Sequence, residues 1–162
     1  MNKEKTNRVL EYFDELFPDA YCELNHESDF QLLVAVMLSA QTTDKKVNQL
    51  TENLFKKYPT VEAVSQASLP ELEQDIKTIG LYRNKAKNLL ALSHVLIEQF
   101  DGIVPSDQKQ LESLPGVGRK TANVVRSVAF DIPAFAVDTH VERISKRLGF
   151  AKRDDNVLTV EK

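Results

Sequence analysis

Residues 114–122, which read LPGVGRKTA, join a glycine turn to the start of a helix, and this stretch decides how the fold is interpreted. Gly116 and Gly118 flank one small apolar residue, Val117, so the backbone can take angles that other residues resist. Two missing side chains also let an anion approach. Amides in the first turn of the following helix point toward such an anion, and the helix dipole favours it. A glycine turn alone would be an ordinary connection, but the Arg-Lys-Thr-Ala that follows favours phosphate binding.

Helical signals extend on both sides of this turn, and strand signals are scarce, with one short apolar run at residues 134–137. Apolar residues recur at intervals of three and four and are interrupted by proline and glycine. This pattern predicts an all-α fold. The apolar stripes or runs cover residues 9–17, 30–38, 47–58, 72–79, 86–100, 111–114, 122–129, 141–148 and 157–160.

Capping residues set the expected helix ends. Ser28 with Gln31, and Ser68 with Glu71, have the spacing of capping boxes. Glycines just beyond an apolar stripe predict C-terminal stops. The expected starts are at Ser106, Arg119, Asp138 and residues 154–156, and the expected stops are at Pro18, Pro59, Gly80, Gly102 and Gly149.

Composition predicts a globular chain with its positive charge in one segment. Of the 162 residues, 42% are hydrophobic, which excludes a disordered chain. Net charge is −3, yet residues 103–153 carry nine basic and five acidic side chains, an excess that suits phosphate binding but also occurs on ordinary solvated helices. We expect no membrane span and no secretory signal, because the apolar runs are short and residues 1–8 are polar. The lone Cys22 fits a reducing cytoplasm.

Several motifs together resemble a known family. The pattern LPGVGRKTANVV, followed 18 residues after Lys120 by the aspartate of VDTHVERIS, is similar to the endonuclease III family of bifunctional DNA glycosylases with AP-lyase activity. Residues 38–44, LSAQTTD, and residues 79–82, IGLY, also resemble family segments in the expected order. The resemblance covers about residues 23–150. It implies the helix-hairpin-helix DNA glycosylase superfamily and a multi-helix, barrel-like domain.

The resemblance also implies a domain organisation. It comprises an N-terminal helix in residues 1–22, a helical core in residues 23–135 with the hairpin motif at 106–130, and the start of a second helical subdomain in residues 136–162. In the family the N-terminal helix packs with a C-terminal part that follows this subdomain. We therefore expect Val9, Leu10, Phe13 and Phe17 to expose apolar surface.

Lys120 is the candidate nucleophile. An amine suits attack on the anomeric carbon of a nucleoside, because the resulting Schiff base promotes β-elimination of the 3′ phosphate. Lys120 sits in the first turn of the expected helix beside Arg119, and both the dipole and the neighbouring cation disfavour its charged form. Without the family resemblance, a lysine that pairs with phosphate or solvent would be the simpler interpretation.

Asp138 is the second candidate. A carboxylate near the anomeric carbon stabilises an oxocarbenium-like transition state and helps to move protons. Aspartate before Thr139 and His140 is also a good helix N-cap, and both roles are compatible. The resemblance implies the catalytic role. Glu112 matches an acidic position of the family's hairpin, but a surface helix glutamate is the simpler interpretation.

A base inside a duplex must be flipped out before it can be excised. The resemblance implies that Gln41 contacts the orphaned partner base and that Leu81 wedges into the stack, as apolar side chains do in DNA-kinking proteins. The alternative interpretations are that Gln41 is an ordinary loop glutamine and Leu81 an ordinary core leucine. It also implies that Asp44 and His140 line the site. Phosphate would be gripped by the hairpin amides together with two neighbours, Arg119 and Thr121.

Family members usually carry four further cysteines that hold a [4Fe–4S] cluster. Cys22 is the only cysteine here, so we expect no cluster or metal from these residues. The predicted function is removal of oxidised pyrimidines followed by strand cleavage, with double-stranded DNA bearing a damaged base or abasic site as partner. We expect a cytoplasmic, nucleoid-associated monomer. A non-catalytic helix-hairpin-helix DNA-binding fragment is the main alternative. A monofunctional, adenine-removing relative is disfavoured, because such enzymes lack lysine at the position of Lys120.

Overall fold

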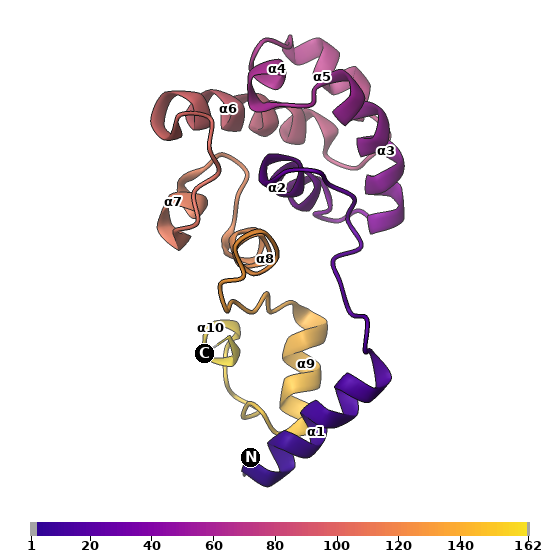
Figure 1. Cartoon of the computed structure of the whole chain (residues 1–162), viewed down its shortest axis with the longest axis vertical. Helices are drawn as coiled ribbons and strands as arrows, with labels where there is room; N and C mark the ends of the chain where they lie inside the picture. Colours follow the sequence, from indigo (N-terminus) through magenta and orange to yellow (C-terminus); the bar gives the residue numbers. More distant parts are fainter. Residues whose placement is uncertain (1–2, 162) are drawn as a thin grey trace. The chain divides into compact units, whose positions relative to one another are not determined.

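The computed structural model describes residues 3–161, and every regular element in that range is a helix (Figure 1). The predicted all-α class is confirmed. The chain divides into a larger unit, residues 23–134, and a smaller unit formed by residues 1–22 and 135–162. The larger unit holds α2 (Asp29–Leu38), α3 (Asp44–Lys57), α4 (Val61–Ser65), α5 (Leu69–Ile76), α6 (Tyr82–Phe100), α7 (Gln108–Ser113) and α8 (Arg119–Phe130). The smaller unit holds α1 (Lys3–Leu16), α9 (Thr139–Leu148) and α10 (Val157–Val160).

Helix α2 is the centre of the larger unit. Residues 30–38 are all buried, which explains why this segment is apolar nearly all round. It contacts α3, α6 and α8 (Figure 1). Ser28 caps the helix by accepting from the Gln31 N–H at 3.2 Å. The predicted capping box is shifted by one residue, because the Gln31 side chain accepts from the Glu27 N–H at 2.9 Å and not from that of Ser28.

Helices α4 and α5 pack against α6, and α3 packs against α2 and α5. Helix α4 has no counterpart in the sequence expectations, because five residues are too few to show a helical period. Its start is marked by Thr60, whose hydroxyl accepts from the Ala63 N–H at 3.3 Å. Helix α5 ends at Ile76, so Ile79 lies beyond the helix on which its spacing had placed it.

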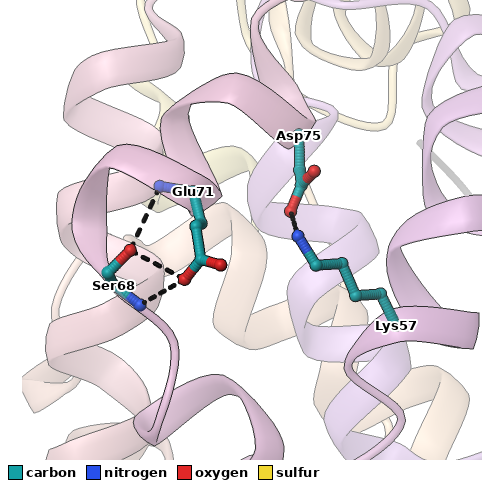
Figure 2. A network of polar contacts seen from close by, with 4 residues as sticks. All are labelled: Lys57, Ser68, Glu71 and Asp75. Atoms are coloured by element: carbon teal, nitrogen blue, oxygen red, sulfur yellow. Dashed lines mark hydrogen bonds and ion pairs between the residues drawn. The ribbon is translucent and has the colours of Figure 1, made fainter.

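The capping box of α5 is confirmed and can be followed in Figure 2. The Ser68 hydroxyl accepts from the Glu71 N–H at 3.4 Å and donates to the Glu71 carboxylate at 2.7 Å. That carboxylate also accepts from the Ser68 N–H at 3.2 Å, and these bonds lower the pKa of Glu71. Nearby, Lys57 on α3 donates to Asp75 on α5 at 2.8 Å, and this bond raises the pKa of Lys57 (Figure 2).

The smaller unit exposes much of its apolar surface. Helix α1 buries no residue. Leu10, Phe13 and Phe17 are exposed, as the sequence predicts, and Val9 is half-buried; Leu16 is exposed as well. Helix α9 ends at Gly149, whose φ of 85° is left-handed, and α10 begins after Asn156, whose side chain accepts from the Thr159 N–H at 3.0 Å. Within residues 3–161, no helix is long and apolar enough to cross a membrane.

Candidate functional site

The turn between α7 and α8 is closed and anchored by apolar residues. The Val117 N–H donates to the Leu114 carbonyl at 3.1 Å, and both side chains are buried. Gly116 has a left-handed φ of 77°. A Cβ there would lie 2.9 Å from Asn88 Cβ on α6 and 3.0 Å from Met37 Sδ on α2. The turn therefore packs so closely on two helices that only glycine fits at this position.

Gly118 plays a different part in the same turn. It is the N-cap of α8, its backbone is extended (φ −95°, ψ 175°), and a Cβ would meet no atom within 4 Å. The absent side chain leaves open space in front of the helix N-terminus, where backbone amides and the dipole favour an anion. Arg119 and Lys120 follow with exposed side chains, and Thr121 is half-buried. Two helices joined by such a turn define a helix-hairpin-helix motif.

Arg126 braces the two helices of this motif, a role that the sequence expectations missed. Its guanidinium donates to Gln108 Oε1 on α7 at 2.9 Å and to the Ser106 carbonyl at 3.3 Å. Gln108 in turn donates to the carboxylate of Glu112, which is exposed on α7 as the simpler interpretation expected. Helix α7 starts at Gln108 and not at Ser106, because Asp107 is its cap and accepts from two backbone amides at 3.0 Å.

Gln41 lies in the exposed turn between α2 and α3. Its φ is 57°, which is left-handed and costs an L-residue about 1–2 kcal/mol. The turn is closed by the Thr42 N–H, which donates to the Ser39 carbonyl at 2.9 Å. Asp44, predicted to line the site, is the exposed first residue of α3. The structure thus presents the Gln41 side chain on the surface from a turn that something must hold in place.

Leu81 lies in a second turn of the same kind, before α6. It is 58% exposed, so the alternative of an ordinary core leucine is wrong. The sequence placed the backbone break at Gly80, but the left-handed residue is Leu81 itself, with φ 57° and ψ 27°. An exposed leucine in a strained backbone is a departure from local preference, and such departures cluster at functional sites.

A buried lysine underlies these turns. Lys85 on α6 is 6% exposed, and its Nζ donates to the Leu38 carbonyl at 2.8 Å, to the Ala40 carbonyl at 2.7 Å and to Thr42 Oγ1 at 3.2 Å. Burial lowers the pKa of Lys85. The sequence expectations missed this residue. The neighbouring residues carry no signal for it, because Lys87 also adjoins Ala86 and is exposed.

Asp138 is the N-cap of α9, as predicted. Its Oδ1 accepts from the His140 and Val141 N–H groups, both at 2.9 Å, which orients the carboxylate. His140 is exposed, with its Nδ1 3.2 Å from an Arg143 guanidinium nitrogen. Both residues belong to the smaller unit and Lys120 to the larger, so the pairing of Lys120 with Asp138 stays a prediction.

Comparisons with known proteins identify the family to which this chain is similar. A family model described as "HhH-GPD superfamily base excision DNA repair protein" matches residues 34–162. The whole chain is 56% identical to endonuclease III of Bacillus subtilis (strain 168) and covers 74% of that protein. Over 99% of its length it is 47% identical to endonuclease III of Escherichia coli (strain K12), of which it covers 76%.

Solved structures agree with these sequence relatives. The chain is similar to a trapped endonuclease III–DNA covalent intermediate, with a TM-score of 0.93 at 56% identity over 99% of this chain and 76% of that one. A thermostable thymine-DNA glycosylase shares the fold, with a TM-score of 0.84 at 24% identity over 96% of this chain and 76% of that one. The chain belongs to the endonuclease III family of DNA glycosylases and AP lyases, within the HhH-GPD superfamily of base excision DNA repair proteins.

The residues present do not fit the iron–sulfur cluster that this family implies. A [4Fe–4S] cluster takes four thiolates, and Cys22 is the only cysteine of the sequence. Among residues 3–161, no three His, Cys, Asp or Glu side chains lie close enough together to hold a metal ion.

Proposed function

We propose that this chain excises oxidised pyrimidines from duplex DNA and cleaves the strand 3′ to the abasic site through a Schiff base on Lys120. The observation that carries the proposal is the position of Lys120 in the first turn of α8, directly behind the open space at Gly118. A backbone phosphate bound at this helix N-terminus would place the adjoining sugar within reach of the lysine side chain. Lys120 is an exposed residue, as contact with a nucleotide requires.

The reaction needs a nucleophile and a group that handles protons. The neutral Lys120 Nζ attacks C1′ while the C1′–N bond breaks, and the departing base takes the bonding electrons and a proton. The C1′–O4′ bond then opens with protonation of O4′, leaving an iminium between C1′ and Nζ. Loss of a C2′ proton forms the C2′–C3′ double bond and expels the 3′ phosphate. We assign Asp138 to stabilise positive charge at C1′ and to relay protons, with its carboxylate oriented by the capping bonds.

Base extrusion is assigned to the two left-handed turns. We infer that Leu81 enters the base stack and that Gln41 hydrogen-bonds the orphaned partner base. Their exposure and their position at the apices of turns support these roles. Backbone phosphate is bound by the amides at Gly116 and Gly118, whereas Val117, whose N–H already donates to the Leu114 carbonyl, anchors the turn between them. Four further side chains complete the proposed DNA contact: Arg119, Thr121, Asp44 and His140.

The remaining expectations follow from this activity. The proposed partner is double-stranded DNA with a damaged base or an abasic site, bound by a monomer in the cytoplasm at the nucleoid. No step uses a metal or a cluster, because each bond change above is served by Lys120, Asp138 or solvent. Binding should weaken steeply with salt, since the proposed contacts are mostly to phosphate.

Borohydride trapping tests the proposal directly. The purified 162-residue chain is mixed with an abasic duplex and sodium borohydride, which reduces an iminium to a stable amine. We expect a covalent adduct for the wild type and for Lys56→Gln, a matched exposed lysine on α3. Lys120→Gln should bind the duplex and form no adduct. Salt-sensitive duplex binding with no adduct from the wild type would instead favour the non-catalytic DNA-binding fragment.

A further inference from the structure

The two turns assigned to base extrusion share one structural support. Gln41 and Leu81 are far apart in sequence, yet both are non-glycine residues with a φ of 57°. Neither conformation is favoured locally, so contacts from elsewhere must hold each turn. Lys85 makes bonds to both of them.

The side chain of Lys85 brackets the Gln41 turn. Two of its acceptors, the Leu38 and Ala40 carbonyls, precede Gln41, and the third, the Thr42 hydroxyl, follows it. An ammonium group has three donors, and these acceptors match all three. Leu38 ends α2, where helix carbonyls need partners and the dipole favours a cation. Lys85 therefore fixes the backbone before Gln41, holds the Thr42 side chain after it, and closes the end of α2.

The backbone of Lys85 belongs to the Leu81 turn. Its N–H donates to the Leu81 carbonyl at 3.0 Å, which is the first hydrogen bond of α6. Any movement of this helix start therefore moves the Lys85 side chain, and with it the Gln41 turn. Lys85 thus connects the two turns, because its side chain bonds to one and its backbone N–H bonds to the other.

A buried ammonium is a costly way to fill space. An unbranched apolar side chain of similar length would pack between α2 and α6 without desolvating a charge. The lysine does what such a side chain cannot, because it holds three oxygen atoms of one turn at hydrogen-bonding distance. With 6% of its surface exposed, it is also too buried to bind phosphate as a surface lysine does.

We propose that Lys85 is a positioning residue for base extrusion, which keeps Gln41 and Leu81 in a fixed relation so that both enter the DNA together. The proposal rests on the proposed function, because it requires Gln41 and Leu81 to act in extrusion. Lys85 itself contacts neither DNA nor the reacting sugar. Its effect on the reaction passes through Gln41.

The test is a double-mutant cycle between Lys85→Met and Gln41→Ala. Extrusion is followed by the fluorescence of 2-aminopurine placed opposite the abasic site, and kcat/KM is measured on a duplex with an oxidised pyrimidine. Lys85→Met should lower the 2-aminopurine fluorescence signal and kcat/KM each by about tenfold or more in the wild-type background, because small misplacements of positioning groups are costly. In the Gln41→Ala background the further loss should stay within about twofold, since the two residues act as one unit.

Controls separate positioning from folding. Lys87→Met, an exposed lysine on the same helix, should change neither readout. Lys85→Arg should restore part of the activity, because guanidinium donors can reach some of the same acceptors. If Lys85→Met does not fold, Thr42→Val removes one acceptor and should give a smaller loss that is likewise hidden by Gln41→Ala. Urea unfolding of every variant shows which losses of activity are explained by a loss of folding stability.

Equal losses in both backgrounds, or a loss that follows stability alone, would overturn the positioning role. The wild-type trapping experiment distinguishes this failure from failure of the proposed function. If the wild type forms the Lys120 adduct while the cycle shows no coupling, only the Lys85 proposal is wrong. If the wild type forms no adduct, the catalytic proposal fails before Lys85 is considered.

Discussion

The two glycines of the hairpin turn should respond in opposite ways to the same substitution. At Gly116, an alanine must adopt a φ of 77°, which costs an L-residue about 1–2 kcal/mol. Its Cβ would also lie 2.9–3.0 Å from atoms of Asn88 and Met37, well inside the ordinary carbon contact of about 3.5–4.0 Å. Because Asn88 Cβ is next to the α6 backbone, the overlap is relieved only by a shift of that helix or of the turn itself.

The magnitude follows from these two costs. Overpacking of a well-packed site costs about 1–3 kcal/mol, to which the left-handed penalty is added. Reduced entropy of the unfolded chain returns about 0.4–1 kcal/mol. We expect Gly116→Ala to destabilise the fold by about 1–5 kcal/mol, or about 2–20 °C in Tm for a chain of this length.

Gly118→Ala should leave the stability nearly unchanged and weaken DNA binding. Its extended backbone suits alanine, and the new methyl group meets no protein atom within 4 Å. The loss of glycine at an N-cap and the gain from the unfolded state are each below about 1 kcal/mol and oppose each other. The methyl group occupies the space proposed for phosphate, and losing one charge-assisted hydrogen bond weakens binding about tenfold.

Two measurements check this pair. Urea unfolding followed by circular dichroism gives the stability of each variant. Fluorescence anisotropy of a labelled abasic duplex gives the affinity, in a Lys120→Gln background that prevents cleavage. Equal stability of the two alanine variants would show that the close packing at Gly116 is not as described, and unchanged affinity in Gly118→Ala would refute phosphate binding at this turn.

Two further predictions concern a helix start and a strained turn. Ser68→Ala should lower the free energy of unfolding by about 1 kcal/mol through loss of the cap of α5, measured by urea unfolding. The pKa of Glu71 is lowered from 4.5 in the folded chain, so the stabilisation from its carboxylate is present above about pH 4.5 and is lost as pH falls through the lower folded value. The difference in unfolding free energy between wild type and Glu71→Gln should therefore close in acid. A difference that stays constant with pH would contradict this. Leu81→Gly should stabilise the fold by about 0.5–1 kcal/mol by relieving the left-handed strain, while reducing 2-aminopurine extrusion, and a stability loss would argue against strain at Leu81.

Helix positions were largely predictable, because their signals are local. The box of Ser68 and Glu71, the cap at Asp138 and the glycine turn before Arg119 all act within a few residues. The errors arose where neighbouring residues compete for one role. Asp107 and Ser106 are both good caps, and only the geometry of the chain selects Asp107.

The motifs of the candidate site could be predicted from the sequence, but its packing and backbone conformations could not. The pattern around Gly116 and Gly118 predicts an anion-binding turn, and the structure adds that the first glycine is required by packing and the second leaves open space. The roles of Lys120 and Asp138 stay predictions. The sequence alone also carried no indication that Leu81, and not Gly80, would take the left-handed conformation.

The order of residues by itself determined the all-α class, most helix starts and the family to which the chain belongs, because periodicity, caps and motifs are properties of short segments. Tertiary structure alone decided that Lys85 is buried and that it bonds to the turn around Gln41. One of its acceptors there, the Ala40 carbonyl, lies 45 residues before it in the chain. The reason is physical. A lysine is indistinguishable from its exposed neighbours until helix packing removes water from it and brings three oxygen atoms within reach of its amine.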